Sequence, residues 1–156
     1  MKALSLLQPW ASLVVLGHKH IETRSWNTKY RGKLLIHASG KKGHVDLRED
    51  EFYKHYCPLY ERNKIEAIEK LPIGSIIGKV NLLEVITTER ARELIGEKSN
   101  IFNEEFLKGN KEKELAFGDY SEGRYAWLLS DPVLFKKPIP AKGQLGIWNY
   151  EGGIEI

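Results

Sequence analysis

Segments typical of β-strands stand near both ends of this chain. Successive side chains of a strand point to opposite faces, so alternating apolar and polar residues create one apolar face that other strands must cover. On this pattern, and on a run rich in Ile, Val and Leu, we predict strands over residues 21–26, 33–39, 75–88, 124–130, 133–135 and 146–150. Residues 27–32, NTKYRG, have the length and the glycine of a hairpin loop. Gly78 predicts a bulge or a close approach to the backbone.

Helix-forming segments stand between groups of these strands. Residues 8–16 predict a short buried helix with Pro9 in its first turn, and residues 89–95 predict another. Residues 45–70 predict two helices broken near Cys57-Pro58, because proline disfavours the helical conformation of the preceding residue. Segregated helices and strands indicate an α+β fold. Five or six twisted, mostly antiparallel strands with few helices close most economically into a small β-barrel with flanking helices.

Length and composition predict one domain. The 156 residues, 42% of them hydrophobic, suffice for a single core. We expect one domain over residues 1–156, with a helical insertion at about 45–70 and a polar, mobile segment at about 96–114. No uncharged segment approaches the roughly 20 residues of a membrane helix. Together with the single cysteine, Cys57, this predicts a soluble, cytoplasmic chain that does not partner a membrane.

Positive charge is concentrated at the start of the chain. The net charge is only +3, yet residues 1–44 contain eight lysines and arginines and a single acidic residue, Glu22. Gathered on one face, these basic side chains would attract a polyanion such as a nucleic acid. Dispersed, they would form an ordinary solvated surface. Charge alone leaves both interpretations open.

Lys19, Glu22, Arg24 and Trp26 form the candidate site of this region. Glu22, Arg24 and Trp26 fall on one face of the predicted strand, just after Lys19. Lysine and arginine bind phosphate, a carboxylate accepts from an exocyclic amine, and an indole stacks, so the set suits a nucleotide. The alternative is a Glu22–Arg24 ion pair beside a core tryptophan. The segment HKH, residues 18–20, offers two imidazoles but no further ligands, so we predict no metal site or cofactor, although a divalent metal requirement is left open.

The same residues resemble a known family. The segment LSLLQPWASLVVLGHKHIETRSWNTKYRGKLLIHAS, with GRYAWLLSDPVLF and IPAKGQLGIWN near the end of the chain, is similar to the signature of the ASCH domain, the activating signal cointegrator homology family. The resemblance covers about the first 40 and the last 35 residues. It implies a PUA-like fold, a small β-barrel with flanking helices and a cleft.

The resemblance also implies that this cleft is basic and binds RNA, another single-stranded nucleic acid, or a modified nucleoside or nucleotide. Protein partners are left open. The nucleic-acid-binding residues predicted on this basis are Lys19, Glu22, Arg24, Trp26, Arg31, His37, Ser39, Lys41, Lys42, Tyr125 and Lys142.

Two alternatives to a binding module stay open, and the first is a small hydrolase that uses the same cleft. Some relatives are amidohydrolases on N4-acetylcytidine, with a threonine three residues after the lysine and a distant glutamate; Glu22 holds that position here and Thr23 is adjacent. Others are ribonucleases, for which Lys19, Glu22 and Arg24 would be the catalytic residues. The second alternative is a protein-interaction module in transcription or translation regulation that uses the helices within residues 45–70 and 89–114.

Overall fold

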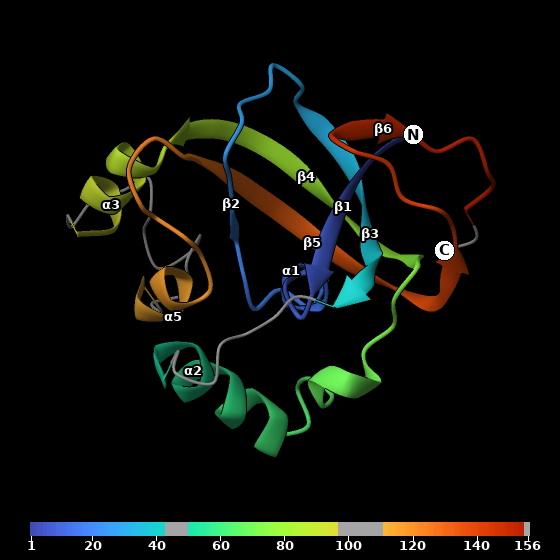
Figure 1. Cartoon of the computed structure of the whole chain (residues 1–156), viewed down its shortest axis with the longest axis horizontal. Helices are drawn as coiled ribbons and strands as arrows, with labels where there is room; N and C mark the ends of the chain where they lie inside the picture. The colour runs from blue at the N-terminus through green and yellow to red at the C-terminus, as the bar shows by residue number, and fades with distance from the viewer. Residues whose placement is uncertain (43–49, 97–110, 155–156) are drawn as a thin grey trace.

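The computed structural model describes residues 1–42, 50–96 and 111–154, with side chains omitted at residues 42 and 50. Within these residues, six strands form one mixed, mostly antiparallel sheet in the order β2-β5-β4-β3-β1-β6. Figure 1 shows that the sheet curls strongly into a half-barrel with a few flanking helices, which confirms the predicted α+β class. The strands are β1 (Lys2–Gln8), β2 (Ile21–Arg24), β3 (Gly32–Lys42), β4 (Ser75–Thr87), β5 (Tyr125–Pro140) and β6 (Ile147–Asn149).

Helices pack inside and beside this sheet. The helices are α1 (Trp10–Val15), α2 (Asp50–Glu61), the 3-10 turn η1 (Ile68–Lys70), α3 (Thr88–Gly96) and α5 (Lys111–Ala116). The helix α1 lies against the sheet, and α2 and α5 lie side by side (Figure 1). Within residues 1–42, 50–96 and 111–154, no helix has the length and apolar composition needed to cross a membrane.

Strand β1 was not predicted, because it lacks the expected alternation. It pairs in parallel with β3 and antiparallel with β6. Its side chains are buried on both faces of the sheet, with Leu4 and Leu6 in one apolar cluster and Ala3 in another. A strand covered on both sides reads as a continuous apolar run rather than an alternating one.

The turn from β1 into α1 is built by a buried glutamine. Gln8 is fully buried, and its Oε1 accepts a hydrogen bond from the backbone N–H of Ser12 at 3.0 Å. Its Nε2 donates to Ser12 Oγ at 2.8 Å and to the carbonyl of Pro72 at 2.9 Å. Gly17, with φ +79°, then ends the helix in the left-handed conformation. Gln8 therefore satisfies a helix N–H group and anchors a distant loop at once.

Two predictions about how the strands are connected were wrong. Residues 27–32 do not close a hairpin, because β2 pairs with β5 while β3 pairs with β4 and β1. The segments predicted as separate strands at 124–130 and 133–135 are one continuous strand, β5, with a backbone of positive φ at Asp131. Pairing partners come from distant segments, so local alternation located the strands and could not connect them.

The predicted break near Cys57-Pro58 was also wrong, since α2 runs through Pro58. Its buried side chains, Phe52 and Tyr56, hold the helix against the body, while Pro58 lies on the exposed side. Pro58 removes one helical hydrogen bond, to the carbonyl of Lys54, a residue that is also exposed. Solvent compensates for that loss, so packing on the opposite face decides the conformation.

The polar segment predicted at 96–114 is described only near its ends. Residues 97–110 lie outside the described residues, as do residues 45–49 of the predicted helical insertion. Residues 111–114 belong to α5, and Glu114 is fully buried there. This end of the segment is therefore packed into the protein and is not a solvated tail.

The sheet is covered on both faces. On the concave face, Leu34, Ile36 and Ala38 of β3 pack with α1 residues and with Trp127. On the other face, Leu35 packs with Trp148 and its neighbours. Burial of both faces of β3 fixes its register, because a slip of one residue would exchange the two sets.

Gly78 marks the closest approach within the sheet, which confirms the prediction. A Cβ at this position would lie 2.2 Å from the carbonyl oxygen of Val133 and 2.7 Å from Cγ1 of Val15. We expect Gly78→Ala to lower the free energy of unfolding by about 1–3 kcal/mol, because neither neighbour can move without repacking. Urea unfolding measures this change in the free energy of unfolding. Gly40→Ala, where a Cβ meets nothing within 4 Å, should change little, and equal midpoints for the two variants would contradict the steric argument.

Candidate functional site

A buried charge cluster lies where β2 meets α5. Lys19 is 2% exposed; its Nζ donates to the carbonyl of Ile21 and lies 3.6 Å from Oε2 of Glu22. From α5, Glu114 accepts hydrogen bonds from the backbone N–H groups of His20, at 2.5 Å, and Ile21, at 3.2 Å. The cluster thus joins a turn and a helix that are more than 90 residues apart.

Burial perturbs the acid–base behaviour of this cluster. It raises the pKa of Glu114 to about 7, and the nearby Lys19 ammonium and the two N–H donors only partly oppose this. Burial also raises the pKa of the Tyr120 hydroxyl well above its ordinary value, and the carboxylates of Glu114 and Glu22 add to the effect. No hydrogen-bond partner from the described residues reaches that hydroxyl. Such polar groups, buried together, are typical of functional sites.

Glu22 connects the cluster to a pocket of about 220 Å³. Its Oε2 is buried and has no hydrogen-bond partner among the described residues, although the Lys19 ammonium lies nearby. A buried carboxylate oxygen without a donor is costly, and a ligand N–H could satisfy it. The remaining lining residues are Trp10, Thr23, Phe52, Ala116, Phe117, Gly118 and Asp119.

Lys19 does not line this pocket. Its side chain lies beneath Glu22, so it holds the carboxylate in place and does not meet a ligand phosphate directly. The charged residues that line the pocket are Glu22 and Asp119, and no lysine or arginine is among them. Asp119 accepts hydrogen bonds from Ser121 and lies 3.5 Å from Arg124, and the Ser121 bonds hold the pKa of its carboxyl below the ordinary value. The pocket therefore suits a group rich in N–H donors.

Thr23 lines the same pocket as Glu22, although the two residues are adjacent on a strand. Its Oγ1 accepts a hydrogen bond from the backbone N–H of Asp119 at 2.9 Å, and its side chain packs against Gly118. The chain around Gly118 folds over this edge of the sheet. Alternation places the side chains of Glu22 and Thr23 on opposite faces of β2, so the pocket wraps around the strand edge.

Arg24 and Trp26 belong to an aromatic group beside the pocket. The guanidinium of Arg24 lies 5.5 Å from the ring centroid of Trp26, and Trp26 packs edge-on against Trp127 at 4.8 Å. Tyr125 is the cross-strand partner of Arg24. No ion pair from the described residues reaches Arg24, so the Glu22–Arg24 pair considered as an alternative does not form. The arginine is left as a partly exposed cation on an aromatic surface.

The side chain of Arg31 stabilises the fold. It pairs with Glu84 and donates to the carbonyls of Thr28 and Tyr30, each at 2.8 Å. These bonds shape the loop between β2 and β3, and they use three of the five N–H donors of the guanidinium. We therefore assign Arg31 a structural role.

The remaining predicted residues line a different pocket, of about 580 Å³, at the far ends of β3 and β5. These residues are His37, Ser39, Lys41 and Lys142. His37 is buried, with Nδ1 3.0 Å from Ser5 Oγ and Nε2 2.7 Å from the Ala141 carbonyl, so it organises the loop. The side chain of Lys42 lies outside what the structure describes. The eleven predicted residues thus fall at several places and not in one cleft.

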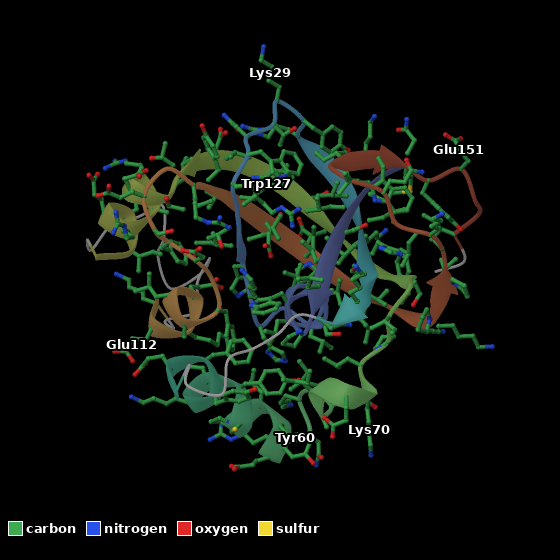
Figure 2. The ribbon with its side chains drawn as sticks, viewed as in Figure 1. Lys29, Tyr60, Lys70, Glu112, Trp127 and Glu151 are labelled. Carbon is green, nitrogen blue, oxygen red and sulfur yellow. The ribbon has the colours of Figure 1, made fainter. Side chains whose placement is uncertain are left out.

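The basic residues of the N-terminal segment are likewise dispersed. Lys19 is buried, Lys41 lines the second pocket, and Lys29 projects from the tip of a loop (Figure 2). In the part of the chain that the structure describes, no three His, Cys, Asp or Glu side chains come close enough to hold a metal ion. His18 instead lies 3.1 Å from the carbonyl of Lys64.

Sequence reasoning missed Glu114, Tyr120 and the apolar walls of the first pocket. Glu114 lies in a segment that was predicted to be polar and mobile, and its partners are 93 and 94 residues away. One signal could have helped: the segment LAFGDY, residues 115–120, places two aromatic residues around a glycine just after the charged run. That composition is typical of a packed turn.

Comparisons with known proteins agree on one family. The sequence model of the ASCH domain matches residues 4–138. The chain is 29% identical over 151 residues to activating signal cointegrator 1 of Mus musculus and of Homo sapiens. That alignment covers 97% of this chain and 22% of each relative, so the chain spans about a fifth of their length.

Solved structures are also similar. The crystal structure of ASCH from Zymomonas mobilis has 18% sequence identity and a TM-score of 0.46, over 88% of this chain and 71% of that chain. A mutant of the same Zymomonas mobilis protein has the same identity and TM-score, over 88% of this chain and 73% of that chain.

Proposed function

This chain belongs to the ASCH domain family, and we propose that it binds a nucleobase with N–H donors in the pocket beside Glu22. The base is carried either by single-stranded RNA or by a modified nucleoside. The buried Oε2 of Glu22, which lacks a hydrogen-bond partner among the described residues, carries this proposal. An exocyclic amine or ring N–H of a base would supply the missing donor.

The aromatic walls of the pocket support a flat ligand. Trp10, Phe52 and Phe117 line it, with ring centroids 5.9 Å apart for Trp10–Phe52 and 5.3 Å apart for Phe52–Phe117. Aromatic walls bind a base by packing on its faces. The volume of about 220 Å³ is below the roughly 300–1,000 Å³ of drug-sized pockets, which suits a single base and excludes a folded nucleic-acid segment.

Arg24 is the candidate phosphate contact. It lies on the same strand as Glu22, outside the pocket, and no ion pair from the described residues occupies its guanidinium. A base seated beside Glu22 would leave its sugar and phosphate outside the acidic lining. Salt-dependent affinity that decreases in Arg24→Ala would indicate a nucleotide or RNA, whereas salt-independent binding would indicate a nucleoside.

We expect Glu22→Gln to weaken binding of a base at least tenfold, because the variant loses the charge-assisted acceptor and the partner of Lys19. Quenching of tryptophan fluorescence from Trp10, titrated with cytidine, N4-acetylcytidine, adenosine, guanosine and uridine, measures the affinity. Glu151→Gln is the matched control, because Glu151 is exposed (Figure 2) and does not line this pocket. Equal affinity of wild type and Glu22→Gln, in folded protein, would refute the assignment.

Thr23 supports a second candidate function, hydrolysis in the same pocket. Thr23 lines the pocket together with Glu22, which lies 3.6 Å from the buried Lys19, although the threonine of the resembled amidohydrolases would stand at the position of Glu22. Incubation with N4-acetylcytidine and with short RNA, followed by chromatography, tests it. Cytidine and acetate from wild type but not from Thr23→Val would make the chain an enzyme, and binding without product would make it a binding module.

A further inference from the structure

A groove of about 610 Å³ separates the segment that follows α2 from the second half of β5. We call it the α2–β5 groove; residues 60–72 form one wall and residues 134–138 the other. Ser12 of α1 and Leu16, just after that helix, also line it. It shares no lining residue with the pocket beside Glu22. A ligand of this groove and a base in the pocket would therefore contact different residues.

The wall formed by residues 60–72 is held in place. The Tyr56 hydroxyl donates to the carbonyl of Glu66 at 2.7 Å, and the Gln8 side chain donates to the carbonyl of Pro72 at 2.9 Å. Ile65 and Leu71 are buried in the apolar cluster beneath. These anchors come from α2, β1 and the core, so the groove exists before a ligand arrives, and a ligand need not pay for its formation.

Each wall presents a large apolar side chain to solvent. Tyr60 is 51% exposed and Leu134 is 53% exposed. On β5, alternation places Leu134, Lys136 and Pro138 on the same exposed face. Half-exposed apolar groups on both walls of a preformed groove are typical of a surface that contacts another molecule.

The charge of the lining defines the complementary ligand. Lys64, Lys70 and Lys136 line the groove against one carboxylate, Glu66, and among the described residues no ion pair engages these three ammonium groups. Tyr60 and Lys70 lie on the same side of the molecule (Figure 2). An occupant must therefore bring carboxylates together with apolar side chains.

We propose that the α2–β5 groove binds a short acidic peptide segment of a partner protein, with its apolar side chains on Tyr60, Leu134 and the buried floor, and its carboxylates on the three lysines. The aliphatic floor suits leucine or phenylalanine better than stacked bases. Addition as an extra strand is disfavoured, because Pro138 and Pro140 remove donors from this part of β5. The peptide is thus recognised through its side chains.

Fluorescence anisotropy with a fluorescein-labelled peptide, DELFDELLDE, tests the proposal. Wild type should bind with salt-dependent affinity. Lys70→Glu combined with Lys136→Glu should weaken binding at least tenfold, and Leu134→Ser should weaken it without changing the salt dependence. Lys29→Glu is the matched control, because Lys29 projects from a loop far from the groove (Figure 2) and should bind normally. Glu22→Gln should also bind the peptide normally, which separates this proposal from base binding.

Three results would overturn the proposal. Equal binding of a charge-reversed peptide, KKLFKKLLKK, would refute acidic recognition. Displacement of the acidic peptide by single-stranded RNA, with RNA binding lost in the double lysine variant, would make the groove a nucleic-acid site. Concentration-dependent dimerisation that disappears in Leu134→Ser, without peptide binding, would make a second copy of the chain the occupant.

Discussion

Trp127→Ala is expected to destabilise the protein by about 3–5 kcal/mol, a large part of the roughly 5–15 kcal/mol that stabilises a domain. Trp127 is fully buried on β5, within the cluster that joins α1 to the sheet (Figure 2). Trp26 packs edge-on against Trp127, and the indole N–H of Trp127 donates to the Trp26 carbonyl at 3.4 Å. Urea unfolding followed by circular dichroism measures the loss.

Trp127→Phe is the control for this prediction. It keeps an aromatic ring in the cluster and removes only the second ring and the N–H donor, so it should cost clearly less than the alanine variant. An alanine variant as stable as wild type would mean that the surrounding side chains collapse into the space, and the half-barrel would not depend on this residue.

Glu114 is expected to make the stability of the protein depend on pH. Its pKa is about 7 in the folded state, because of burial, and near the ordinary 4.5 when unfolded. Between these values the folded state binds more protons than the unfolded state, so the free energy of unfolding falls as pH rises. The contribution is fully present below about pH 4.5 and is lost as pH rises through about 7, and it amounts to roughly 3 kcal/mol.

The difference between wild type and Glu114→Gln isolates this contribution from other titrating groups. The glutamine stays neutral and keeps an acceptor for one of the two backbone N–H groups, so the variant should lose less stability than wild type between pH 5 and 8. Glu112→Gln, an exposed position in the same helix, should follow the wild-type curve (Figure 2). Parallel curves for wild type and Glu114→Gln would show that Glu114 titrates as an exposed carboxyl.

Strands β3 and β4 could be located from patterns in the sequence, while β1 could not. The alternation of residues 33–39 placed β3, and the run of Ile, Val and Leu in residues 75–88 placed β4 nearly to the residue. Leu4, Leu6 and Ala3 of β1 are buried on two faces, which removes the polar positions that mark a strand.

The candidate site was also predictable only in part. The spacing of Lys19 and Glu22 was enough to predict that they act together, and they lie 3.6 Å apart. The burial of Lys19, the structural pairing of Arg31 with Glu84 and the separation of His37 from Glu22 were not predictable. Each depends on which distant residue packs against a side chain.

By itself, the sequence determined the fold class, the family and the residues that carry charge near β2. These follow from local alternation and from motifs within short segments, which act over a few residues. Only the tertiary structure decided that Glu114 closes the cluster, that Thr23 shares the pocket with Glu22, and that the predicted nucleic-acid residues do not gather in one cleft. Those outcomes depend on contacts between segments nearly 100 residues apart, whose energies no local pattern encodes.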